Sequence, residues 1–136
     1  MTTSDETALP RLLRQMVEDI QDPQCSYWLK ANYFDIQQPT ERSVTRWWQA
    51  PLYIDYDALW NPNFEKDGFQ IDVILKNQLP AERERIRIDY AQIWSLERIH
   101  QGEKPKSAQD WVLFHDSAKL KFPPVEGEVD IDTENQ

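Results

Sequence analysis

The chain has 136 residues, a formal net charge of −9 and a single cysteine. This length fits one domain that buries its own core, and an aromatic share of 12% excludes a disordered chain. The negative charge disfavours binding to nucleic acid and to anionic membrane surfaces. The lone cysteine and the polar N-terminus, which lacks a signal-peptide pattern, predict a cytoplasmic protein.

The first predicted element is an amphipathic helix over about 8–21. Its apolar residues recur with the spacing of one helical face: Leu9, Leu12, Leu13, Met16, Val17 and Ile20. Thr7 is the expected N-cap, which places Pro10 in the first turn, where a missing N–H costs little. Pro23 disfavours helical geometry at the residue before it, so the helix should end near Asp22.

Strands are predicted from about residue 27 onward, where the helical period gives way to alternation. The expected strands cover 27–36, 43–48, a segment that begins at Leu52, 69–75, 85–90, the ambiguous stretch 91–99, and 111–114. The run Asn61-Pro62-Asn63, followed by Asp67-Gly68, predicts a loop or hairpin turn. Because most connections are short, the sheet should be mainly antiparallel.

The predicted fold class is therefore α+β. One N-terminal amphipathic helix should pack on a mainly antiparallel sheet of about four to six strands. We expect a single domain over 1–122, ended by Pro123-Pro124. The segment 123–136 contains acidic residues and no basic residue, which predicts a disordered acidic tail.

Catalytic and metal-binding interpretations find little support. The candidate metal ligands have spacings that fit no common zinc site: Cys25, His100, Asp110, His115 and Asp116. An acid–base nuclease built on the two histidines with Lys119 and Lys121 conflicts with the net charge. Neither a phosphate-binding glycine loop nor a serine-nucleophile motif occurs. We therefore expect no catalytic residue, no metal and no cofactor.

Two groups of charged residues remain. Asp55 and Asp57 would share one face of a strand and could hold Mg²⁺ or act as acid and base, although alternating acids are also typical of a solvent-facing sheet. Arg83, Arg85 and Arg87 form a positive row on one strand. We expect this row to pair with acidic residues on a neighbouring strand.

Aromatic residues are the most informative feature. The chain contains six Trp and five Tyr, more than one small core needs, and exposed Trp and Tyr dominate protein interfaces. One segment joins large aromatic side chains to negative charge. It supplies the predicted partner-binding residues: Trp47, Trp48, Asp55, Asp57 and Trp60.

The sequence thus favours a non-enzymatic, protein-binding regulator or accessory subunit that docks on a more basic protein partner. An inhibitor, an immunity-type protein or an assembly factor would fit. The alternative is a small ligand-binding domain or hydrolase with a pocket lined by carboxylates and histidine. A third interpretation is a homodimer that buries the aromatic residues. No direct contact with nucleic acid or membrane is expected.

Overall fold

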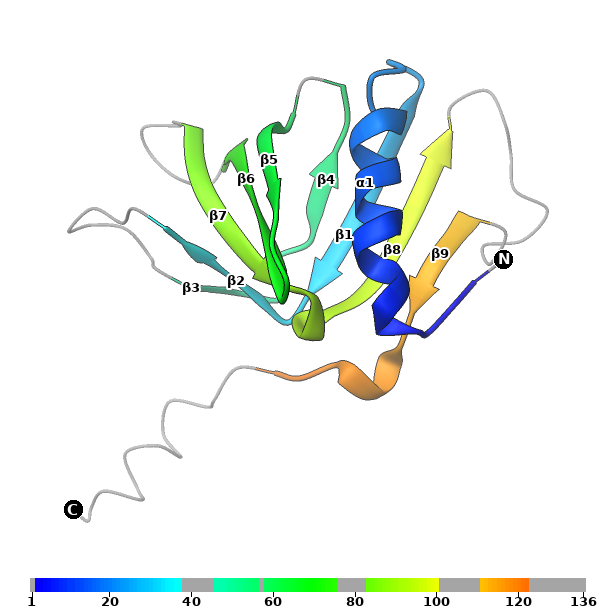
Figure 1. Ribbon diagram of the computed structural model, residues 1–136, viewed down its shortest axis with the longest axis vertical. Coiled ribbons are helices and arrows are strands. Elements are labelled where there is room, and N and C mark those ends of the chain that lie inside the picture. The colour runs from blue at the N-terminus through cyan, green and yellow to red at the C-terminus, as the bar shows by residue number, and fades with distance from the viewer. Residues whose placement is uncertain (1, 38–45, 57, 76–82, 101–110, 123–136) are drawn as a thin grey trace, which may run out of the picture.

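The computed structural model describes residues 2–37, 46–56, 58–75, 83–100 and 111–122 (Figure 1). One N-terminal helix packs on antiparallel sheets of four and five strands, which confirms the predicted α+β class. Each sheet has the expected number of strands, but the sequence pattern did not reveal that there would be two. The predicted acidic tail over 123–136 lies outside the described residues.

The four-stranded sheet has the order β4-β1-β8-β9 and the five-stranded sheet the order β3-β2-β7-β6-β5. All paired neighbours are antiparallel. The strands are β1 (Cys25–Ala31), β2 (Tyr33–Ile36), β3 (Arg46–Trp48), β4 (Leu52–Ile54), β5 (Trp60–Phe64), β6 (Gly68–Ile74), β7 (Arg83–Asp89), β8 (Ile93–His100) and β9 (Val112–His115).

Helix α1 spans Leu9–Asp19 and follows a 3-10 turn, η1, over Glu6–Ala8. The predicted apolar face is the buried one, since Leu9, Leu12, Leu13, Met16 and Ile20 are all buried. The predicted cap at Thr7 was wrong. The chain enters the helix through η1, and the Asp5 carboxylate caps that turn by accepting a hydrogen bond from the Thr7 N–H at 3.0 Å.

The helix lies in the angle between the two sheets. At its end, the Asp19 carboxylate accepts a hydrogen bond from the Tyr27 hydroxyl on β1 at 2.5 Å. On another side, the guanidinium carbon of Arg14 lies 4.3 Å from the centre of the Phe64 ring on β5. Contacts to both sheets explain why one short helix can bury most of its apolar face, of which Val17 is half-buried. Among the described residues, no helix has the length and apolar content needed to cross a membrane.

Besides the connection from β4 to β5, three segments of the chain pass from one sheet into the other. β1 continues into β2 at Asn32, β3 into β4 through 49–51, and β7 into β8 through the 3-10 turn η2 (Tyr90–Gln92). The order β4-β1-β8 in one sheet therefore repeats as β3-β2-β7 in the other. The two sheets are halves of one sharply bent layer, as Figure 1 shows.

Asn32 holds this bend together and is fully buried. Its side-chain nitrogen donates to the Gln92 side-chain oxygen at 3.0 Å and to the Lys119 carbonyl at 2.9 Å. Its side-chain oxygen accepts from the Gln49 amide at 3.1 Å and from the Lys121 backbone N–H at 2.6 Å. All hydrogen-bonding groups of this side chain are therefore satisfied, and its partners include a residue from each of the other two crossings.

The predicted loop at 61–63 was wrong, because this segment belongs to edge strand β5. The register with β6 shifts between Trp60 and Asn63, and Asn61 has a φ of 52°. This bulge accommodates Pro62, which an edge strand tolerates because its N–H is not needed for pairing. The predicted hairpin turn is present after this strand, where the Glu65 N–H donates to the Gly68 carbonyl at 2.8 Å.

Candidate binding pocket

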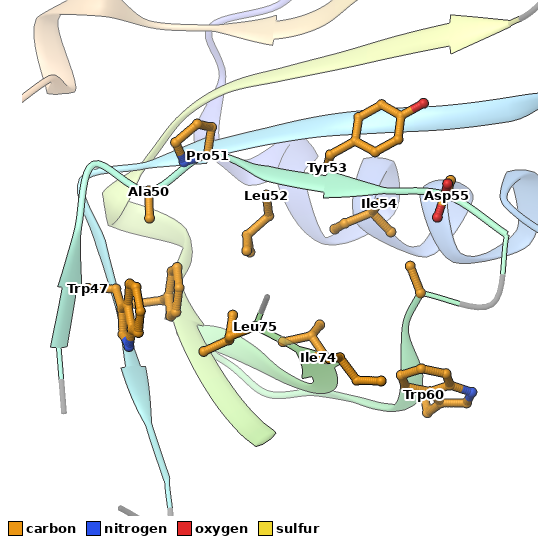
Figure 2. A pocket seen from close by; sticks show the side chains of 13 residues that line it. Trp47, Ala50, Pro51, Leu52, Tyr53, Ile54, Asp55, Trp60, Ile74 and Leu75 are labelled. Atoms are coloured by element: carbon orange, nitrogen blue, oxygen red, sulfur yellow. The ribbon is translucent and has the colours of Figure 1, made fainter. Parts of the chain in front are cut away.

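A cavity of about 500 Å³ lies between strand β4 and the β5–β6 hairpin. We call it the β4 pocket. Its wall is mainly apolar and includes Phe34, Trp47, Leu52, Ile54, Trp60 and Leu75. Figure 2 shows Leu52 and Ile54 pointing from β4 into the pocket, opposite Ile74 and Leu75 from the end of β6.

The pocket exists because the bent layer does not close on itself. β4 is the last strand of one sheet and β5 is the last strand of the other. The chain joins them through 55–59, yet no pairing between β4 and β5 occurs in the described part of the chain. Apolar side chains from both strands therefore border a gap instead of packing on each other.

Two indole rings lie at opposite ends of the pocket (Figure 2). Trp47 on β3 stacks on Phe34 of β2, with ring centres 6.2 Å apart and planes 8° from parallel. Trp60 on β5 is covered by the Arg83 guanidinium, whose carbon lies 3.9 Å from the ring centre. Both indoles are half-buried. Rings held in this way offer a large apolar contact area at a low entropic cost on binding.

Large exposed apolar side chains occur both beside the pocket and elsewhere in the described residues. Ile74, which lines the pocket, is 45% exposed, and Tyr56, which follows Asp55 in the chain, is 55% exposed. Tyr53 is 44% exposed but points away from Leu52 and Ile54 (Figure 2), and it packs on Trp28 and donates a hydrogen bond to Ser26 at 3.0 Å. Exposed apolar surface beside a pocket is typical of an interaction site.

Asp55 is the charged residue of the pocket wall. Its half-buried carboxylate forms no ion pair or hydrogen bond with any residue in the described ranges. Other strand carboxylates differ: Asp35 pairs with Arg46 at 2.7 Å, and Asp72 pairs with Arg85 at 3.0 Å. The Asp55 carboxylate is thus available to a basic group of a ligand.

The residues predicted for partner binding have different locations. Trp47, Asp55 and Trp60 all line the β4 pocket. Trp48 points to the other face of β3 and packs on Tyr33, with ring centres 4.9 Å apart. Asp57 lies outside the described residues.

Sequence reasoning missed the aliphatic wall of the pocket. Leu52, Ile54, Val73 and Leu75 occupy alternating positions of predicted strands, and none of them was selected as a binding residue. The spacing gives the face of a strand but not whether another layer covers that face. No signal in the pattern distinguishes a pocket wall from a core in this case.

The residues considered for catalysis do not converge. No group of three His, Cys, Asp or Glu among the described residues could hold a metal ion. Cys25 is buried, and this burial raises the pKa of its thiol, which makes it a poor nucleophile. His115 Nδ1 lies 3.4 Å from Ser95 Oγ, but Glu97 contacts the serine rather than the histidine, so no triad forms. The side chain of His100 and the whole of Asp110 lie outside the described structure.

The arginine row has the predicted pairing role in part, since Arg83 lies over the Trp60 ring instead. Arg85 forms an ion pair with Asp72 on the neighbouring strand β6 at 3.0 Å, and Arg87 pairs with Glu65 at 3.0 Å. A hydrogen bond from Asn61 to Asp72 at 2.8 Å, followed by the contact with Arg85, lowers the pKa of the Asp72 carboxyl. These charges stabilise the sheet beside the pocket and are already matched.

Comparison of the chain with protein-family models and with curated proteins gave no match. The function has to be inferred from the geometry and charge of the β4 pocket.

Proposed function

We propose that this chain is a non-enzymatic binding protein, a regulator or accessory subunit, whose β4 pocket receives apolar side chains of a more basic protein partner. The observation that carries this proposal is a mainly apolar pocket with an indole at each end and the Asp55 carboxylate in its wall. Trp47 and Trp60 supply half-buried contact area, and Ile74 adds exposed apolar surface. Interfaces draw most of their affinity from such a centre with a polar rim.

Charge supports a basic partner. The chain has a net charge of −9, and Asp55 brings an unmatched carboxylate to the pocket wall. A basic group of the partner would find both a long-range attraction and a specific contact at this site. With the cytoplasmic location expected from the sequence, the partner would be encountered in that compartment.

A second candidate is a carrier or sensor of an apolar small molecule. It is favoured by the pocket's volume of about 500 Å³, which lies within the roughly 300–1,000 Å³ typical of small-molecule sites. The charge of the wall favours the protein partner, because an apolar small molecule would leave the Asp55 carboxylate without a basic group to contact. A hydrolase would need several converging polar groups in the pocket, whereas the described wall supplies one carboxylate.

The test compares three tagged proteins purified from the native cell: the wild type, Trp60→Ala and Trp111→Ala. Trp111 is also half-buried but lies next to β9, at the opposite edge of the four-stranded sheet. It therefore controls for the loss of an indole as such. We expect a protein partner with the wild type and Trp111→Ala, and its loss with Trp60→Ala.

The captured partner is then purified and its association rate measured at low and high salt. The proposal requires direct binding and a rate that falls as salt is raised. Equal capture by all three proteins would contradict it. If native mass spectrometry instead finds a small apolar molecule in the wild type and not in Trp60→Ala, and no protein is captured, the second candidate is correct.

A further inference from the structure

We propose that the occupant of the β4 pocket is an extended segment of the partner protein, which pairs with the free edge of β4 as an additional strand. This inference rests on the proposed function and specifies how the partner binds. β4 pairs with β1 along one side through Leu52, Tyr53 and Ile54. Its other side has no strand partner among the residues that the structure describes.

Of the other three outer strands, β9 and β5 have protected edges, whereas β3 also lacks an outer strand partner among the described residues. On β9, the Thr3 N–H donates to the Leu113 carbonyl at 3.1 Å, and the His115 N–H donates to the Thr3 carbonyl at 2.9 Å. On β5, the bulge at Asn61 and the missing N–H of Pro62 interrupt the edge. β4 has neither form of protection within the described chain, so its backbone groups are available for pairing.

The pocket extends along the whole length of β4. Residues from Ala50 to Asp55 border it, and Leu52 and Ile54 point into it (Figure 2). An extended segment in this position would meet backbone groups of β4 on one side. On its pocket face it would place an apolar side chain between Trp47 and Trp60, which lie at the two ends (Figure 2).

The same geometry specifies the chemistry of the segment. Alternate side chains of a strand point to the same face, so the segment needs apolar residues at alternate positions. Asp55 follows β4 directly and has no charged partner in the described ranges, so a Lys or Arg should lie at the end of the segment that is nearest to it. Main-chain pairing would supply affinity, and these pockets would supply sequence preference.

The test uses random peptides displayed on phage and selected against the full-length protein. We expect the selected peptides to share alternating apolar residues followed or preceded by Lys or Arg. One selected peptide is then resynthesised with a single N-methyl group at each position in turn, which removes one backbone N–H at a time. Strand addition predicts a loss of about tenfold in affinity at alternate positions only, because every second N–H points to β4.

The outcomes separate this inference from the proposed function. If peptides bind, lose binding in Trp60→Ala and keep it in Trp111→Ala, yet show no alternation in the N-methyl series, the pocket binds protein but not by strand addition. If no selected peptide depends on Trp60, the proposed function itself fails at this site. If light scattering shows that the protein self-associates and the selected peptides dissolve that association, the occupant is a second copy of the chain, and a separate partner is excluded.

Discussion

The side-chain amide of Gln49 donates a hydrogen bond to the side-chain oxygen of Asn32 over 3.1 Å. The Gln49 backbone N–H also donates to the Asn32 carbonyl at 2.8 Å, and together these bonds hold Gln49 at a φ of 50°, which is uncommon for a residue with a side chain. Trp47 lies just before this bend and β4 just after it. The Asn32–Gln49 pair therefore fixes the orientation of Trp47 relative to β4.

Replacing Asn32 with alanine should destabilise the protein by about 3 kcal/mol, because it leaves several buried groups without hydrogen-bond partners. Among them is the Lys121 backbone N–H, which now donates to Asn32 at 2.6 Å. Urea unfolding measures the effect. Gln37→Ala is the control, since this residue is exposed and should change the unfolding free energy by less than about 0.5 kcal/mol. Equal midpoints for wild type and Asn32→Ala would refute the structural role of the bend.

Tyr27 should make the protein sensitive to alkaline pH. Burial, followed by the hydrogen bond to Asp19, raises the pKa of its hydroxyl above the ordinary value. A raised pKa means that the protonated form stabilises the fold. This contribution is complete below the unfolded-state pKa of about 10 and is lost as the pH rises above it towards the folded-state value.

The measurement is the unfolding free energy of wild type and Tyr27→Phe from neutral to alkaline pH. At neutral pH the variant should be less stable by about 1 kcal/mol through the lost hydrogen bond. Above about pH 10 the wild type should lose stability more steeply, so the two curves converge. Tyr56→Phe, at an exposed position, should follow the wild type. Parallel curves for Tyr27→Phe and wild type would contradict this assignment.

Asn61 should control the acidity of Asp72. Its side-chain amide donates to the Asp72 carboxylate at 2.8 Å and is the main cause of the lowered pKa. Asn61→Gly is the appropriate variant, since glycine keeps the positive φ of 52° without strain. NMR titration should show the pKa of Asp72 rising towards its ordinary value in Asn61→Gly.

The same variant should alter acid stability. A lowered pKa contributes stability that is present above the unfolded-state pKa and is lost as the pH falls through the folded-state value. Asn61→Gly should therefore lose less stability on acidification than the wild type does. Asn63→Ala, which changes an exposed residue of the same strand, serves as the control. An unchanged Asp72 pKa in Asn61→Gly would show that another contact dominates.

Asp55 should affect the rate of partner binding more than the stability of the fold. Asp55→Asn removes a carboxylate that has no ion pair within the described residues, so the unfolding free energy should change little. The association rate should fall by a few-fold, and its salt dependence should weaken. Asp67→Asn removes the same charge at an exposed turn and should have a smaller effect. Equal rates for the two variants in stopped-flow measurements would rule out a specific role for Asp55.

The spacing of apolar residues within single elements was sufficient to predict part of the fold. The apolar spacing of α1 and the alternation of Phe69, Ile71 and Val73 match the buried positions, because each depends on one face of one element. The two-sheet arrangement was not predictable in this way. The stretch 27–36 alternates throughout, and nothing in that alternation records that its pairing partners change at Asn32.

The site was predictable only in its aromatic and acidic members. Trp47, Asp55 and Trp60 were selected because large rings and negative charge occur close together in the sequence, and all three line the β4 pocket. Leu75, which directly follows β6, lines the same pocket. Its position depends on the long-range bend of the sheet, which neighbouring residues do not encode.

The central claim is that a protein partner binds at the β4 pocket, and the most direct test observes the indole signals of the six Trp by NMR. The captured partner, or a selected peptide, is titrated into the labelled protein. We predict that the signals of Trp47 and Trp60 shift together, with an affinity that weakens as salt is raised, while that of Trp111 stays in place. Saturable binding that moves Trp111 and leaves Trp47 and Trp60 unchanged would contradict the account.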